Sequence, residues 1–206
     1  KDNTLFVNLF LGNTANIRIG GKEVVLQQQT QYPWEGDVAI KVVSTKTKDF
    51  EMKIRIPGWV RNEVVPSDLY TFNDNEQTGY SVEVNGEKME SKIEKGYFSL
   101  KRKWKKGDVV KVHFDMKPRT VTANAKVRDD RGRVAIERGP LVYCAEEADH
   151  FGMDVHHFFL GEQPRMKVEE KEIKNTEGDN GVFKVQSVVV ENAQLMETDS
   201  QGRLSV

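Results

Sequence analysis

The chain has 206 residues, long enough for one large or two small domains with a hydrophobic core. Its 31 basic and 32 acidic residues give a net charge of −1, which argues against a nucleic-acid-binding domain, since such domains carry a basic excess. No apolar run approaches the roughly 20 residues that a membrane-spanning helix needs. The single cysteine, Cys144, excludes an intramolecular disulfide and leaves the cellular compartment open.

The first segment, residues 1–12, reads KDNTLFVNLFLG. Its apolar stretch is short and is interrupted by Asn8, so it does not match a signal peptide. Because the chain also lacks an initiator methionine, we expect a piece of a longer protein whose export signal lies upstream. The corresponding expectation is a periplasmic or extracellular location.

Alternation of apolar and polar residues is the dominant pattern along the chain, and it is typical of strands with one buried face. Gly20–Gly21 and Asn85–Gly86 tolerate the positive φ angles of tight turns and predict two hairpins. Since helical periodicity is absent, the pattern predicts an all-β fold, an antiparallel, jelly-roll-like β-sandwich, most simply two consecutive sandwich domains. The predicted buried faces comprise Val38, Ile40 and Val42; Met52, Ile54 and Ile56; and Val110, Val112 and Phe114, with Lys111 and His113 on the outer side.

Three stretches interrupt this rhythm. Residues 58–80 are too long for a simple hairpin and predict a surface excursion with some packed aromatic side chains. Residues 168–181 are charged and contain glycine, which favours a solvated loop. Pro118 follows a completed strand and cannot donate a ladder hydrogen bond, so we place a domain boundary there, giving domains 1–118 and 119–206. Whether the second domain is complete stays open at this point. A single continuous sandwich is the alternative.

Cys144 is the first candidate for chemistry. It follows Leu141, Val142 and Tyr143, a run that is apolar on both alternating faces, as in a strand covered on both sides. Free cysteine is usually a small buried hydrophobe, whereas a reactive thiol needs an electropositive setting. The nearest charges are Glu146 and Glu147, so we predict a buried, structural cysteine.

A metal site has little support in the sequence. Zinc would need three or four ligands in recognisable groupings, and no C-x-x-C or H-x-x-x-H motif is present. On a strand, His156 and His157 would point to opposite faces. If a metal were bound, Asp149, Asp154 and His156 would be the first ligands to test, but the prediction is no metal in this chain.

Aromatic residues offer a carbohydrate-binding alternative. Trp59, Tyr70, Tyr80 and Trp34 are the candidates for stacking on sugar rings. The competing interpretation, which we favour for Trp34 and Trp59, is packing beneath loops or against a neighbouring domain, because each lies beside Pro or Gly at a strand end. The acidic residues form no glycosidase motif, and neither a phosphate-binding loop nor a nucleophile elbow occurs. We therefore predict no catalytic residue.

Six stretches in order resemble one family. They are LFVNLFLGNTANI, VVLQQQTQYPWEGDVAIKV, FEMKIRIPGWVRN, VEVNG, GYFSLKRKWKKGDVVKVHFDM and DDRGRVAIERGPLVYCAEE, covering residues 4 to about 147. Together they are similar to the C-terminal β-sandwich region of the β-L-arabinofuranosidase-like enzymes of glycoside hydrolase family 127. VVPSDLY, within the excursion, resembles versions from gut-type Bacteroidetes.

The resemblance implies an upstream (α/α)6 catalytic barrel with a cysteine nucleophile and a zinc ion, neither of which matches a position in this chain. The implied function is a non-catalytic accessory portion of a bacterial glycoside hydrolase acting on L-arabinofuranosyl-type glycans. The barrel of the same polypeptide is the expected partner, and a homodimer and a glycan ligand remain open. The alternatives are an autonomous carbohydrate-binding module and a purely structural or adhesive sandwich.

Overall fold

The computed structural model describes residues 3–76, 78–174, 181–198 and 204–205. The chain divides into two compact units. Unit 1 comprises Lys1–Val134 and Arg138–Leu141, and unit 2 comprises Ala135–Glu137 and Val142–Val206. In the described part, no helix is long and apolar enough to cross a bilayer.

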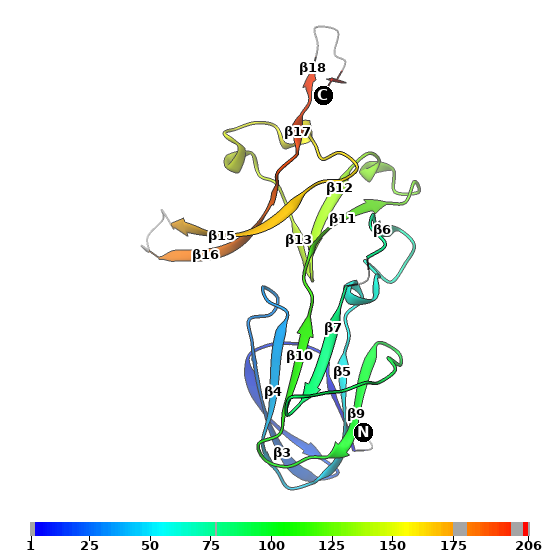
Figure 1. Cartoon of the computed structure of the whole chain (residues 1–206), viewed down its shortest axis with the longest axis vertical. Helices are drawn as coiled ribbons and strands as arrows, with labels where there is room; N and C mark the ends of the chain where they lie inside the picture. Colours follow the sequence, from blue (N-terminus) through cyan, green and yellow to red (C-terminus); the bar gives the residue numbers. More distant parts are fainter. Residues whose placement is uncertain (1–2, 77, 175–180, 199–203, 206) are drawn as a thin grey trace. The chain divides into compact units, whose positions relative to one another are not determined.

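Unit 1 is a two-layer β-sandwich (Figure 1). The smaller layer has the order β1-β5-β9, in which β1 runs parallel to β5. The larger layer has the order β2-β3-β4-β10-β7-β8 and is antiparallel throughout. The strands are β1 (Thr4–Val7), β2 (Asn13–Ile19), β3 (Lys22–Thr30), β4 (Asp37–Thr45), β5 (Asp49–Arg55), β7 (Tyr80–Val84), β8 (Glu87–Lys88), β9 (Tyr97–Lys103) and β10 (Val109–Phe114).

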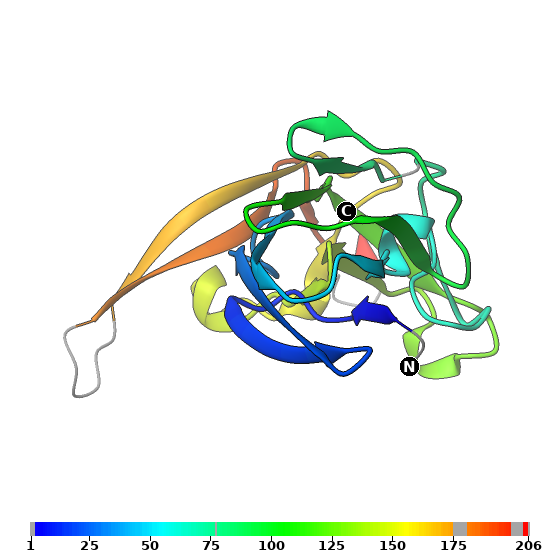
Figure 2. The same cartoon turned by 90° about the horizontal axis from the view of Figure 1, so that it is seen from below.

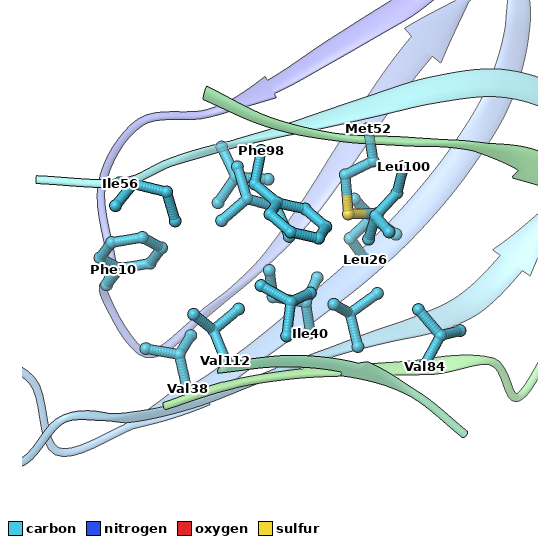
Figure 3. Packing of buried hydrophobic residues seen from close by; sticks show 14 of the residues in the cluster. Phe10, Leu26, Val38, Ile40, Met52, Ile56, Val84, Phe98, Leu100 and Val112 are labelled. Atoms are coloured by element: carbon cyan, nitrogen blue, oxygen red, sulfur yellow. The ribbon is translucent and has the colours of Figure 1, made fainter. Parts of the chain in front are cut away.

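The core lies between these two layers. Figure 3 shows Met52, Phe98 and Leu100 from the smaller sheet facing Ile40 and Val112 from the larger one. The alternating pattern therefore predicted the buried faces correctly, since all nine residues of the three predicted faces are buried. The all-β sandwich prediction is confirmed.

Both predicted hairpin turns are present. Gly20 and Gly21 have φ values of 54° and 77° and connect β2 to β3. Asn85 and Gly86 have φ values of 55° and 85° and connect β7 to β8. Two consecutive positive φ angles match the right-handed twist of the flanking strands, which is why Gly and Asn occupy these positions.

The excursion over residues 58–80 begins with the 3₁₀ turn η1 (Trp59–Arg61) and contains the short strand β6 (Tyr70–Phe72). β6 pairs with β11 (Pro118–Ala123) in antiparallel register. The predicted boundary near Pro118 thus falls where β11 begins, while the compact units divide between residues 134 and 142. The division at Pro118 stays a prediction.

Around the division between the units lie η2 (Arg128–Asp130), β12 (Val134–Arg138) and β13 (Leu141–Tyr143). Unit 2 continues with η3 (Glu147–His150), η4 (Val155–His157), β14 (Phe158–Phe159), β15 (Met166–Lys174), β16 (Val182–Val190), β17 (Gln194–Leu195), β18 (Glu197–Thr198) and β19 (Leu204–Ser205). No described residue of unit 2 is fully buried.

The predicted loop at 168–181 is wrong for residues 168–174, which belong to β15. β15 pairs with β16 alone, over all nine residues, and both strands run as a ribbon in Figure 2. Pairing satisfies the backbone groups of a charged segment that lacks an apolar face. The Lys184 ammonium also lies 2.7 Å from the Glu170 carboxylate across the ribbon. Residues 175–180 lie outside the described part.

Candidate functional site

The four aromatic candidates differ sharply in exposure. Trp59 is 9% exposed and packs edge-on against Phe114, with ring centroids 5.8 Å apart. Trp34 is 47% exposed. Trp59 is therefore packed, as we favoured, and does not offer a face for stacking on a sugar, whereas no loop of the described chain covers Trp34. The turn η1 places the Trp59 ring in the core. Burial raises the pKa of the neighbouring Tyr32, and this effect is larger than the opposing effects of a hydrogen bond with Trp59 and of the positive charge of Arg55.

Tyr70 and Tyr80 are each half-buried. The Tyr70 hydroxyl donates to Asp130 Oδ2 at 2.9 Å, and this hydrogen bond raises the pKa of Tyr70. Tyr80 packs edge-on against Phe98 at 6.4 Å between centroids. No ring contact joins any two of the four candidates in the part of the chain that the structure describes. They do not form one aromatic surface.

Cys144 is exposed, so the prediction that it is buried is wrong. β13 ends at Tyr143, and Val142 and Cys144 both lie on the exposed side, while Leu141 and Tyr143 are half-buried. An apolar run on both alternating faces predicts a strand covered on both sides, but the described chain covers only the face that carries Leu141 and Tyr143. The thiol lies 3.8 Å from Glu146 Oε1.

The suspected metal ligands do not converge. Asp154 Oδ1 accepts a hydrogen bond from the His156 backbone N–H at 2.9 Å, so Asp154 caps the turn η4. Among the described residues, no group of three or more His, Cys, Asp and Glu side chains could hold a metal ion. The described residues therefore do not fit a zinc site.

A hollow of about 480 Å³ lies on the outer face of the six-stranded sheet. The strand register explains its composition, because residues directly opposite one another share a face of the sheet. Gln29, Ala39, Lys111 and Glu83 form one row across β3, β4, β10 and β7. Ala39 has the shortest side chain in this row, so a space lies above it between the longer side chains of its neighbours.

A second row crosses β4, β10 and β7 one pleat further along. Asp37 lies opposite His113, which lies opposite Ser81. His113 Nδ1 and Asp37 Oδ1 are 2.7 Å apart, and both side chains are exposed to solvent. The carboxylate therefore orients the imidazole ring at the floor of the hollow.

The loop between β3 and β4 forms one wall of the hollow through Gln31 and Glu35. Gly36 fixes this loop against β10, since a Cβ atom at Gly36 would lie 1.9 Å from the Phe114 carbonyl oxygen. The Phe114 N–H also donates to the Gly36 carbonyl at 3.0 Å. The wall is thus built into the backbone of the fold.

The sequence did not single out this site. Alternation placed Lys111 and His113 on the outer face, but the residues that surround them come from β3, β4 and β7, far away along the chain. Only the strand order brings Asp37 and Glu83 beside β10. A usable signal was the conjunction of His113 and Asp37 at outward positions of two predicted strands.

Comparison with known proteins covers almost the whole chain. Residues 4–116 match the family model for the middle domain of the family 127 β-L-arabinofuranosidases, and residues 118–197 match the family 127 C-terminal domain. A non-reducing end β-L-arabinofuranosidase from Bifidobacterium longum subsp. longum is 32% identical over an alignment of 154 residues. The alignment covers 72% of this chain and 20% of that protein.

Two solved structures show the same fold. A family 127 β-arabinofuranosidase superposes with a TM-score of 0.87 at 45% identity, covering 99% of this chain and 31% of that one. A β-L-arabinofuranosidase of the same family from Geobacillus stearothermophilus T6 gives 0.71 at 29% identity, covering 92% and 31%. This chain spans about a third or less of the length of these relatives. It belongs to glycoside hydrolase family 127, and it corresponds to the middle and C-terminal domains of the proteins in that family.

Proposed function

We propose that the chain is the accessory, non-catalytic β-sandwich portion of a glycoside hydrolase that acts on L-arabinofuranosyl-type glycans. In this proposal the reaction takes place on a barrel in the same polypeptide, where zinc and a cysteine nucleophile act. The sandwich portion supports that barrel. The enzyme works outside the cytoplasm, on plant polysaccharide or glycoprotein glycans.

One observation carries the proposal. The two family models that match are a middle and a C-terminal domain, and together they account for residues 4–116 and 118–197. The similar enzymes are named β-arabinofuranosidases, and this chain corresponds to 31% of each solved one. Those names support the proposed substrate class.

Exposed apolar side chains support a role as part of a larger assembly. In unit 1, Leu9 and Leu11 are 69% and 57% exposed. In unit 2, Val142 is 67% exposed, and Ile173 opposes Phe183 at an exposed pair of the β15–β16 ribbon. Leaving such side chains in water forfeits the free energy of burial, about 1.5–3 kcal/mol for each large aliphatic or aromatic residue. Contact with the barrel, or with a second copy of the enzyme, would recover it.

The predicted alternative is an autonomous binding module with Trp59, Tyr70 and Tyr80 as its platform. It loses Trp59, which is buried.

The experiment is an assay of the isolated chain on an aryl β-L-arabinofuranoside with zinc and a reductant. We expect no hydrolysis above the uncatalysed rate, and the same result for Cys144→Ala. Zinc-dependent turnover that Cys144→Ala abolishes would overturn the proposal. A second measurement is the coding sequence upstream of Lys1, which we expect to encode a barrel with adjacent cysteines.

A further inference from the structure

We propose that the hollow on the outer face of the six-stranded sheet is a binding site for a neutral saccharide. This inference does not depend on the accessory role, because it concerns a surface that unit 1 presents on its own. At about 480 Å³ the hollow lies within the range of small-molecule sites. Its position on a sheet face, away from the sheet edges, excludes an extended peptide that adds as a further strand.

The lining combines hydrogen-bond donors and acceptors at close spacing. Lys111 offers an ammonium group, Glu83 and Asp37 offer carboxylate oxygens, and Gln29 and Ser81 can both donate and accept. Sugar hydroxyls likewise donate and accept, and several of them lie side by side on one ring. The apolar members of the lining are only Val38, Ala39 and Val112, of which both valines are buried. The surface therefore offers a polyhydroxylated ligand several hydrogen-bonding partners.

The key polar groups are available to a ligand. Lys111 and Glu83 lie directly opposite each other on β10 and β7. Neither side chain takes part in an ion pair among the described residues, although ten other pairs form there. A hydroxyl group between them could accept from the ammonium and donate to the carboxylate, and hydrogen bonds to charged groups are the stronger kind.

The charge of the lining selects against anions. Three carboxylates, those of Glu35, Asp37 and Glu83, face one lysine, with His113 beside them. A phosphate or a uronate would meet a negative excess at neutral pH. A neutral sugar meets no such repulsion, and this defines the ligand class.

The hollow is also preorganised, which lowers the entropic cost of binding. In the wall loop, the Trp34 N–H donates to the Gln31 carbonyl at 2.9 Å, and Arg138 Nη1 donates to the Trp34 carbonyl at 2.9 Å. Thr30 Oγ1 donates to the Asp37 carbonyl at 2.6 Å where the loop enters β4. These bonds hold the wall in place before any ligand arrives.

The test is an NMR titration of the isotope-labelled, full 206-residue chain. Arabinotriose and xylotriose serve as neutral probes and trigalacturonate as the anionic probe. Concentrations should reach about 10 mM, because solvent-exposed hydrogen bonds each contribute little net free energy. We expect at least one of the two neutral sugars to shift the amide signals of residues 37–39 and 111–113. Trigalacturonate should shift the same signals by a smaller amount.

Two variants and one control locate the site. Lys111→Ala removes the ammonium and should weaken binding about tenfold. Ala39→Phe fills the hollow without removing a polar group and should abolish binding. Lys41→Ala is the matched control, since Lys41 is exposed on the same face of β4 but does not line the hollow. Because all three side chains point outward, we expect each variant to keep the melting temperature of the parent chain.

Three results would overturn the inference. The first is that no neutral sugar shifts any amide signal, and the second is that Lys111→Ala and Ala39→Phe bind the sugar as well as the parent chain does. The third is that trigalacturonate binds more tightly than the neutral probes. None of these bears on whether the chain lacks hydrolytic activity, so the two proposals fail separately.

Discussion

Arg119 in β11 binds Asp74 in the excursion through two of its nitrogen atoms, with Nε at 3.0 Å and Nη2 at 2.5 Å from Asp74 Oδ1. The same Nη2 donates to Asn62 Oδ1 at 2.6 Å. The guanidinium also stacks over Phe72, its Cζ atom 3.6 Å from the ring centroid. One buried side chain thus connects three points of the excursion to β11.

Replacing Arg119 should loosen the excursion. Arg119→Ala removes charge-assisted hydrogen bonds to the partly exposed Asp74 carboxylate and the packing on Phe72, and we expect a loss of about 2 kcal/mol in the free energy of unfolding. Arg119→Lys should recover only part of this loss, since lysine lacks the planar fork that pairs with Asp74 and stacks on Phe72. Urea denaturation measures the loss, and limited proteolysis shows whether residues 58–80 become accessible.

Lys117→Ala is the matched control for Arg119. Lys117 pairs with Glu76 of the same excursion at 3.6 Å, but both side chains are mostly exposed. Exposed pairs contribute less than about 1 kcal/mol. Equal losses for Arg119→Ala and Lys117→Ala would contradict the role given to the buried guanidinium.

Asp108 should make the stability of unit 1 depend on pH. Burial raises the pKa of this carboxyl, but the overall pKa is lowered because two kinds of interaction outweigh burial. The carboxyl accepts hydrogen bonds from the Asn85 amide at 3.0 Å and the Lys105 N–H at 2.9 Å, and the positive charges of Arg102 and Lys105 attract it. A group whose pKa is lowered on folding stabilises the fold above its unfolded pKa, about 4 for aspartate, and this contribution is lost as the pH falls through the folded value.

The measurement compares Asp108→Asn with the parent chain in urea at pH 7 and at pH 3. At pH 7 we expect the variant to be less stable by about 2 kcal/mol, because its amide cannot accept from both donors. At pH 3 the difference should shrink. Asp49→Asn, at an exposed position at the start of β5, controls for the general loss of a charge. A difference that is the same at both pH values would refute the assignment.

Cys144 should react with a maleimide in the native isolated chain at a rate close to that of a model peptide, because its side chain is exposed. The accessory proposal adds a second expectation. In the complete enzyme, contact with the rest of the polypeptide should slow the labelling if it covers the face of β13 that carries Val142 and Cys144. Slow labelling of the isolated chain would contradict the exposure seen in the structure.

The three tryptophans should separate in a fluorescence-quenching experiment. Trp104 is fully buried, and its indole N–H donates to the Phe50 carbonyl at 2.9 Å. Trp59 is nearly buried and Trp34 is exposed. Iodide should therefore quench Trp34 alone, and Trp34→Phe should remove most of the quenchable signal. Trp59→Phe serves as the comparison, and quenching that persists in Trp34→Phe would show that Trp59 is accessible.

The sequence by itself determined which residues share a face and where the tight turns lie. Val38, Ile40 and Val42 are buried as alternation requires, and Gly20–Gly21 forms a hairpin turn because few other residues adopt its φ angles. These features depend on neighbours in the chain. The family resemblance also rests on the sequence, and the domain models and solved relatives agree with it.

Only the tertiary structure decided whether each face is covered and which distant residues meet. Cys144 and Trp34 are exposed and Trp59 is buried. The apolar or turn-rich stretches around these three residues nevertheless predict the same packing for each of them. The outer hollow exists because β10 lies between β4 and β7, which brings Asp37 and Glu83 to the two sides of one strand. Periodicity describes the direction of a side chain relative to its own strand, whereas burial and binding depend on the strands and layers that pack around it.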